Sequence, residues 1–327
     1  MGLAEKILEG DEKSGARLIT LIENKKKEGY GELTRLLPHT GKAHILGITG
    51  PAGAGKSTLI AKLAGSMRSK GIKLGIVAID PTSMQTQGAF LGDRVRMNEI
   101  EYPREIFIRS MADREHPGGI ARAALGAIYV MEALGKDVVI VESVGAGQSD
   151  KALFCICDTV VTLFTPEFGD ELQLLKAGLL EIGDIVMVNK WDKANPDEDL
   201  VGTIHASMPE KKETAWSVPI LCAKANTGEG IDEFVKAIEA RWNFLLNDKA
   251  NMTRRKEKIT LFIMTLLREE IWQRFLDNAW MEAGCVRIVE EARSGIIDPY
   301  SAVEKIASIV EQRLQITAEA DCPDGTQ

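Results

Sequence analysis

The sequence predicts an α/β fold in which helices cover both faces of a mostly parallel β-sheet. Short apolar runs alternate with helical segments between residues 41 and 247, which is the pattern of successive strand–helix–strand units. Two loop motifs, at residues 50–57 and 189–192, each follow one of these apolar runs. Because such sheets bind ligands at the carboxyl ends of their strands, both motifs are expected at one edge of the sheet.

Residues 1–40 are predicted to form an N-terminal helical extension. Leu18, Leu21 and Ile22 recur at helical spacing after a polar run, and Pro38 closes the segment. The sheet is then expected to contain six strands, at residues 43–49, 72–80, 137–142, 158–165, 184–189 and 218–222.

The run from Gly50 to Ser57 has the form of a phosphate-binding loop, G-x-x-x-x-G-K-[ST], placed between a strand and a helix. Its glycines allow backbone N–H groups to point at phosphate oxygens, and the helix dipole favours negative charge there. Lys56 is expected to reach the β- and γ-phosphates, and the Ser57 hydroxyl to bind Mg²⁺. The predicted phosphate-binding residues are Gly53, Ala54, Gly55, Lys56, Ser57 and Thr58.

The second motif, Asn189-Lys190-Trp191-Asp192, predicts which base is bound. A carboxylate at Asp192 can accept hydrogen bonds from N1–H and the exocyclic amine of guanine, a pattern that adenine lacks. Asn189 is expected to tie the loops together, and the stem of Lys190 to cover the base. Further on, Cys222-Ala223-Lys224 is similar to the Ser-Ala-Lys loop of GTPases, with a cysteine in place of serine. The sequence therefore predicts a GTP site.

Acidic residues between these motifs are candidates for the magnesium ion. Asp80 ends a predicted strand, and Asp93 lies on a long loop without hydrophobic periodicity, which is typical of a functional loop. Glu142 ends another strand and is followed by Gly145, the arrangement of a Walker B acid and a switch glycine. The alternative for Asp80 and Glu142 is a solvated carboxylate at a strand end. By residue type alone, Asp170 is a plausible helix cap.

Residues 251–317 are predicted to form a helical dimerisation arm, followed by a polar tail at 318–327. Leu261, Met264, Leu267, Ile271 and Phe275 wrap around more than one face of a helix, so a second subunit is expected to cover part of that surface. A second amphipathic helix is expected over 299–314. Residues 41–247 are the predicted GTPase domain.

Composition excludes several classes of function. The 327 residues carry 40 Lys and Arg against 48 Asp and Glu, a net charge of −8, which gives no basic field for nucleic acid. No apolar stretch approaches the ~20 residues of a membrane span, and the N-terminus lacks the order of a signal or transit peptide. Five cysteines without a repeating framework fit a reducing compartment. A cytoplasmic protein is expected.

Taken together, the motifs resemble those of the MeaB-type GTPases, which are associated with methylmalonyl-CoA mutase. The resemblance rests on the two GTP motifs and on the segments between and after them: Asp80-Pro81-Thr82-Ser83, Leu91-Gly92-Asp93-Arg94, Glu142 to Ser149, Gly169 to Gln173 and Asp298 to Ala302.

The resemblance implies a homodimeric P-loop GTPase of the signal recognition particle and metallochaperone (SIMIBI) class. Members accompany adenosylcobalamin-dependent acyl-CoA mutases, gate cofactor loading and protect the mutase from inactivation. By the matching motifs, Ser57, Asp80, Asp93 and Glu142 hold Mg²⁺, and Lys56, Asp93 and Glu142 are catalytic. Gly145, Gln148, Asp170, Glu171 and Gln173 are switch residues that couple the nucleotide to the partner.

Two other functions compete with this interpretation. Cys155 and Cys157 could hold metal in a metal-insertion GTPase, although two cysteines in an apolar run are more often small core residues. A transport-system kinase, as the family was once described, would transfer phosphate from GTP to an acceptor other than water.

Overall fold

The computed structural model describes residues 2–81, 106–113, 119–143, 155–166, 179–193, 200–208, 216–247, 257, 259–264, 266–268, 270–271 and 283–320. Two compact units are present, residues 1–263 and 264–327. The predicted division at residues 40, 247 and 251 remains a prediction. No helix in the described part of the chain is long and apolar enough to cross a bilayer.

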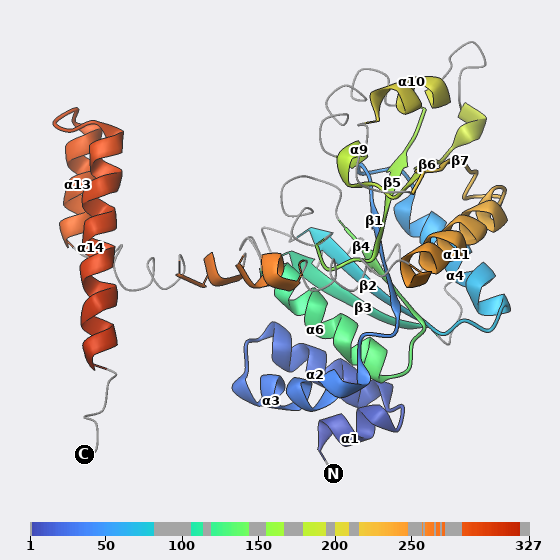
Figure 1. Ribbon diagram of the computed structural model, residues 1–327, viewed down its shortest axis with the longest axis horizontal. Helices are drawn as coiled ribbons and strands as arrows, with labels where there is room; N and C mark the ends of the chain where they lie inside the picture. Colours follow the sequence, from blue (N-terminus) through green and yellow to red (C-terminus); the bar gives the residue numbers. More distant parts are fainter. Residues whose placement is uncertain are drawn as a thin grey trace. The chain divides into compact units, whose positions relative to one another are not determined.

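Unit 1 is built on a seven-stranded sheet in the order β3-β2-β4-β1-β5-β6-β7, and all of its strand pairs are parallel (Figure 1). This confirms the predicted fold class. The strands are β1 (His44–Thr49), β2 (Leu74–Pro81), β3 (Phe107–Asp113), β4 (Val138–Glu142), β5 (Thr159–Phe164), β6 (Ile185–Val188) and β7 (Ile220–Cys222).

Helices cover both faces of the sheet. One face carries α1 (Leu3–Leu8), α2 (Glu12–Glu23), α3 (Lys27–Leu36) with the 3₁₀ turn η1 (Leu37–His39), α6 (Gly119–Ala133), and, over β5 and β6, α9 (Leu179–Ile182) and α10 (Leu200–Ser207). The other face carries α4 (Lys56–Ser69) and α11 (Ile231–Asn247). Successive strand residues alternate between these cores: Val139 and Val141 face the first, Val138 and Ile140 the second.

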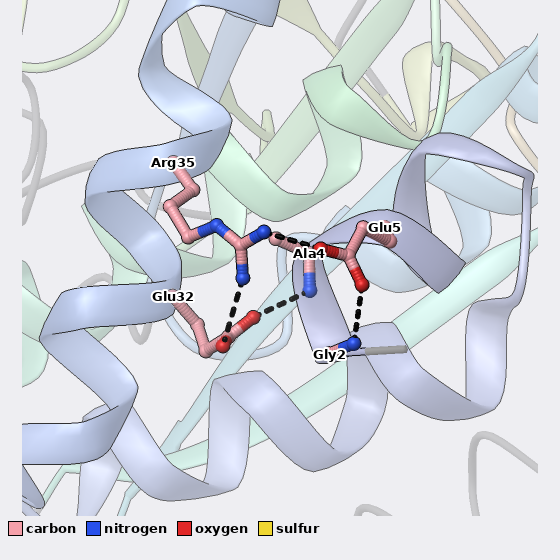
Figure 2. Close-up of polar contacts among 5 residues, drawn as sticks. All are labelled: Gly2, Ala4, Glu5, Glu32 and Arg35. Atoms are coloured by element: carbon pink, nitrogen blue, oxygen red, sulfur yellow. Dashed lines mark hydrogen bonds and ion pairs between the residues drawn. The ribbon is translucent and has the colours of Figure 1, made fainter.

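The helices of the first 40 residues share the core of the sheet. Ile7 of α1, Ile19 and Ile22 of α2 and Leu36 of α3 are buried in the same cluster as strand residues such as Val77. Polar contacts also tie α1 to α3: Ala4 N–H donates to Glu32 Oε2 at 2.6 Å, and Arg35 pairs with Glu5 and Glu32 (Figure 2). These ion pairs are exposed and stabilise little, so apolar burial holds the helices in place.

Strand β3 was not expected from the sequence. It is an edge strand of mixed composition: Phe107 and Met111 are buried, whereas Arg109 and Ser110 are half-buried. Arg109 donates to Thr20 Oγ1 at 3.1 Å and pairs with Glu23, both on α2. Because Arg109 pairs with a helix far away in the sequence, the strand leaves no alternating pattern to detect.

An aromatic and ionic cluster lies at the amino ends of the strands. Arg241 of α11 pairs with Asp184 at 2.9 Å, and its guanidinium lies 5.1 Å from the Trp216 ring and 5.3 Å from the Phe244 ring. Both charged side chains are shielded, at 7% and 17% exposure. The cluster anchors α11 to the start of β6.

Arg241→Met is expected to lower the free energy of unfolding by about 3 kcal/mol, because it leaves the Asp184 carboxylate shielded without its cation. The matched control is Lys70→Met, which breaks the pair with Glu239 at 2.9 Å, where both side chains are more than 40% exposed. That loss should stay below about 1 kcal/mol. Urea unfolding of both variants measures the difference, and equal losses would contradict the assignment of Arg241 as the anchor.

Unit 2 contains α13 (Ala283–Arg293) and α14 (Pro299–Ala320), which pack against each other. Cys285 and Ala302 are buried in this pair. Asp298 caps α14: its carboxylate accepts from Tyr300 N–H at 2.9 Å and Ser301 N–H at 3.0 Å, and the Ser301 hydroxyl donates to it as well. The hydroxyl bond and these N–H bonds lower the pKa of Asp298 below its ordinary value. Helix α14 therefore starts as predicted at Pro299.

Candidate functional site

The phosphate loop connects β1 to α4, and its backbone requires glycine. Gly53 and Gly55 have φ of 78° and 88°. A Cβ on Gly50 would lie 2.4 Å from Leu163 O, and one on Gly55 would lie 2.5 Å from Asn189 Nδ2. The loop therefore fits closely between β5 and the residue that follows β6.

Lys56 lies over this loop. Its Nζ donates to the carbonyl oxygens of Gly50 at 2.8 Å and Pro51 at 3.0 Å, and the residue is 9% exposed. The ammonium is thus held at the concave side of the loop, where a lysine can meet phosphate oxygens.

Ser57 and Glu142 meet at the start of α4 and the end of β4. The Ser57 hydroxyl donates to Glu142 Oε1 at 2.7 Å, and Glu142 is 6% exposed. A hydroxyl and a carboxylate are oxygen donors of the kind that Mg²⁺ prefers. The pair fits a divalent cation bound beside the phosphates.

The backbone of Asp80 lies near this pair. Strand β2 runs beside β4, with Ala78 in register with Glu142, so Asp80 continues past it at the carboxyl edge. Asp93, Gly145, Gln148, Asp170, Glu171 and Gln173 lie outside the described residues. Their predicted roles in metal binding and switching remain predictions.

Asn189 joins the two halves of the site. Its Nδ2 donates to Ala54 O in the phosphate loop at 2.8 Å, and its Oδ1 accepts from Ala225 N–H at 3.0 Å. The residue is 2% exposed. This is the bridging geometry expected from the sequence, and it fixes the spacing between the phosphate loop and the loop that follows β7.

The predicted base-binding residues lie on adjacent loops. Asp192 belongs to the 3₁₀ turn η2 (Trp191–Lys193) and is exposed. Trp191 N–H donates to Ala223 O at 3.2 Å, and Ala223 N–H donates to Val188 O at 2.8 Å. Lys190 has a φ of 56°, unusual for a residue with a side chain and often found at functional sites. The carboxylate of Asp192 is therefore open to a ligand beside the Cys222–Lys224 loop.

Cys222 ends β7 and is half-buried. Burial raises the pKa of its thiol above the ordinary value, so the thiol remains protonated at neutral pH.

The structure adds Glu229, which the sequence analysis did not single out. Its carboxylate accepts from Lys224 Nζ at 2.7 Å across a short turn. The flanking Gly228 and Gly230, both at positive φ, are the sequence signal that could have revealed this turn.

Buried hydroxyls form a second feature that the sequence did not reveal. In the described part of the chain, Thr49, Ser143, Thr162 and Thr165 have buried side-chain oxygens without a hydrogen-bond partner. They lie in or directly after β1, β4 and β5. Threonine is common in ordinary strands, so residue type alone does not distinguish these buried hydroxyls.

The cysteines proposed as metal ligands do not form such a site among the described residues. Cys157 is fully buried in the hydrophobic core, and no group of three His, Cys, Asp or Glu side chains in this part of the chain is placed to hold a metal ion.

Comparison with known proteins extends these observations. The chain is 38% identical over 307 residues to a protein of Pyrococcus abyssi named as a GTPase, covering 93% of this chain and 94% of that protein. It is 37% identical over 204 residues to a fused isobutyryl-CoA mutase of Geobacillus kaustophilus, which is 59% of this chain and 19% of the mutase. The crystal structure of a LAO/AO transport system kinase has the same fold, with a TM-score of 0.70, 22% identity and coverage of 94% and 96%.

The family model of the methylmalonyl-CoA mutase-associated GTPase MeaB matches residues 15–280 and so includes both loop motifs and the whole sheet. The match confirms the resemblance identified from the sequence. The chain belongs to the MeaB family of P-loop GTPases.

Proposed function

We propose that this protein binds GTP and Mg²⁺ at the carboxyl edge of the sheet and hydrolyses GTP to GDP and phosphate. The observation that carries the proposal is the Asn189 bridge, which joins the loop holding Lys56 to the loops beside Asp192. Lys56 neutralises the β- and γ-phosphates, Ser57 and Glu142 bind the metal with Asp80 and Asp93, and Asp192 selects guanine. The site thus offers residues suited to the phosphates at one end and to the guanine base at the other.

We further propose that the protein is a chaperone of an adenosylcobalamin-dependent acyl-CoA mutase. The family description names association with methylmalonyl-CoA mutase, and a related segment occurs within the fused isobutyryl-CoA mutase. Fusion of related sequences into one polypeptide supports a partnership between the separate proteins. GTP turnover would gate cofactor loading and protect the mutase, with residues 169–173 relaying the nucleotide state.

Isolated protein is expected to hydrolyse GTP slowly, and turnover should rise about 5- to 100-fold when methylmalonyl- or isobutyryl-CoA mutase is added. The physical reason is that Gly145 is followed by Ala146, which has no polar group to orient the attacking water as a glutamine does in Ras-like enzymes. Phosphate release measures the effect. Asp170→Asn or Glu171→Gln should reduce the stimulation more than the affinity for GDP.

Fast turnover by the protein alone, unchanged by either mutase and by both substitutions, would contradict this function. Pull-down of the GTP-loaded protein from its own cells, read for mutase subunits, identifies the physiological partner.

We propose that residues 251–317 mediate homodimerisation. Exposed apolar side chains in unit 2 include Met264 at 60%, Leu267 at 49% and Val303 at 67%. Exposed apolar side chains of this kind are typical of a protein interface, and two-fold symmetry is its commonest form.

Light scattering at micromolar concentration is expected to give the mass of a dimer, and Leu267→Glu to shift it toward the monomer while helical content is retained. Leu246→Glu is the matched control, because Leu246 is also exposed, at 64%, but lies on α11 of unit 1. A monomeric wild type would refute the dimer.

A further inference from the structure

We propose that Glu229 is a positioning residue for base recognition: its carboxylate holds the Lys224 ammonium away from Asp192, so that Asp192 remains available to guanine. The inference rests on the proposed function of the site as a GTP site, and it adds to that function a device that protects base specificity.

Lys224 and Glu229 form a closed clasp. Lys224 N–H donates to Glu229 O at 3.0 Å in an antiparallel bridge, and Lys224 Nζ donates to Glu229 Oε2 at 2.7 Å. Between them, Lys224 O accepts from Thr227 N–H at 3.1 Å, from Gly228 N–H at 2.9 Å and from the Thr227 hydroxyl at 3.2 Å. The clasp is therefore made by the backbone as well as by the ion pair.

The backbone after the clasp is pressed against the base loop. Gly230 has a φ of 84°, and a Cβ on it would lie 2.3 Å from Cys222 O and 3.0 Å from Ala223 Cα. This close contact of Gly230 positions the neighbouring backbone of Glu229, from which its side chain extends. The carboxylate can then reach Lys224 without any rearrangement of the loop.

Two carboxylates compete for the Lys224 ammonium. Trp191 N–H donates to Ala223 O at 3.2 Å, which brings the turn containing Asp192 beside the loop that carries Lys224. The Glu229 hydrogen bond, and then the charges of Glu229 and Asp192, raise the pKa of Lys224 above its ordinary value. The Lys224 ammonium is thus paired with Glu229 in the structure, on the loop beside the turn that carries Asp192.

The competition has a chemical consequence for the ligand. Guanine requires the Asp192 oxygens as acceptors for N1–H and the exocyclic amine, and an ammonium bound there would occupy the same lone pairs. Xanthine carries a carbonyl in place of that amine, so an ammonium beside Asp192 would favour xanthine. Loss of Glu229 should therefore shift the preference between the two bases, and not only weaken the site.

Calorimetric titration with GDP and with xanthosine diphosphate tests the inference in the full-length protein. Glu229→Gln should weaken GDP binding by about 2- to 5-fold, the scale of an exposed ion pair, and leave the affinity for xanthosine diphosphate unchanged or higher. Lys224→Met keeps the apolar stem and removes the charge. The double variant should match Lys224→Met within about twofold, because no ammonium is left to compete.

Thr227→Ala is the matched control for simple loosening of the turn, since it removes the hydroxyl bonds to Lys224 O and from Glu229 N–H and no charge. It should lower the affinities for GDP and xanthosine diphosphate by the same factor. In steady state, Glu229→Gln should raise KM for GTP with kcat unchanged.

Three outcomes would overturn the role of Glu229: equal weakening of both nucleotides by Glu229→Gln, no effect at all, or a double variant as weak as Glu229→Gln alone. If the wild type binds GDP no better than ADP, the proposed GTP function itself fails. If the wild type prefers GDP and Glu229→Gln keeps the full preference over xanthosine diphosphate, only the inference fails.

Discussion

Lys56→Ala should lower GTP turnover by about 10²- to 10³-fold, the usual effect of removing one preorganised charge partner of the transition state. In the structure the ammonium lies against the phosphate loop, bonded to the Gly50 and Pro51 carbonyls. A lysine at this place stabilises the charge that develops on the transferred phosphoryl group. Guanine nucleotide should still bind, because the base contacts lie at the other end of the site.

Single-turnover phosphate release measures the chemical step, and calorimetry measures GDP binding. Lys62→Ala is the control, because Lys62 is exposed on the same helix outside the phosphate loop. Unchanged turnover for Lys56→Ala, or an equal loss for Lys62→Ala, would mean that the loop does not hold the catalytic cation.

Asp192→Asn should lower the affinity for GDP by about 10²-fold or more, since two hydrogen bonds to a charged acceptor are lost. The amide offers both a donor and an acceptor at this position, so the variant should bind xanthosine diphosphate more tightly than the wild type does. Asp192 is exposed and lies beside the Cys222–Lys224 loop, so a base can reach it without movement of the core.

Competition binding between GDP and xanthosine diphosphate gives the ratio of their affinities directly. Asp232→Asn, an exposed acid on α11, is the control for a change in net charge and should leave the ratio as in the wild type. Equal affinity of the wild type for GDP and ADP would remove Asp192 as the specificity residue.

Most of the sheet could be predicted from the sequence because its strands are buried on both faces. β1, β4, β5 and β6 are mostly apolar runs, and each is fully buried. The edge strand β3 could not be predicted, since its Arg109 bonds to Glu23 and Thr20, more than 80 positions earlier in the chain. Long-range contacts of this kind leave no local pattern.

The candidate site shows the same division. Gly55, Lys56, Ser57 and Asp192 belong to short motifs whose spacing carries their chemistry, so their grouping at one edge followed from the order of strands and loops. Glu229 acts through Lys224, and an exposed glutamate between two glycines resembles any polar turn. Residues that orient other residues have to be found from geometry.

Asn189 couples the order of the phosphate loop to the order of the loop that follows β7. A single buried amide is bonded both to Ala54 and to Ala225, so neither loop can drift without breaking a bond that the other also needs. Whichever part of a nucleotide docks first reduces the disorder that the remaining part must overcome, and its moieties therefore gain from being covalently joined. If the site holds GTP as proposed, release should follow the reverse course, because a movement that loosens either loop weakens the binding of the whole nucleotide. A partner acting at the phosphates would then promote release of the guanine without contacting it.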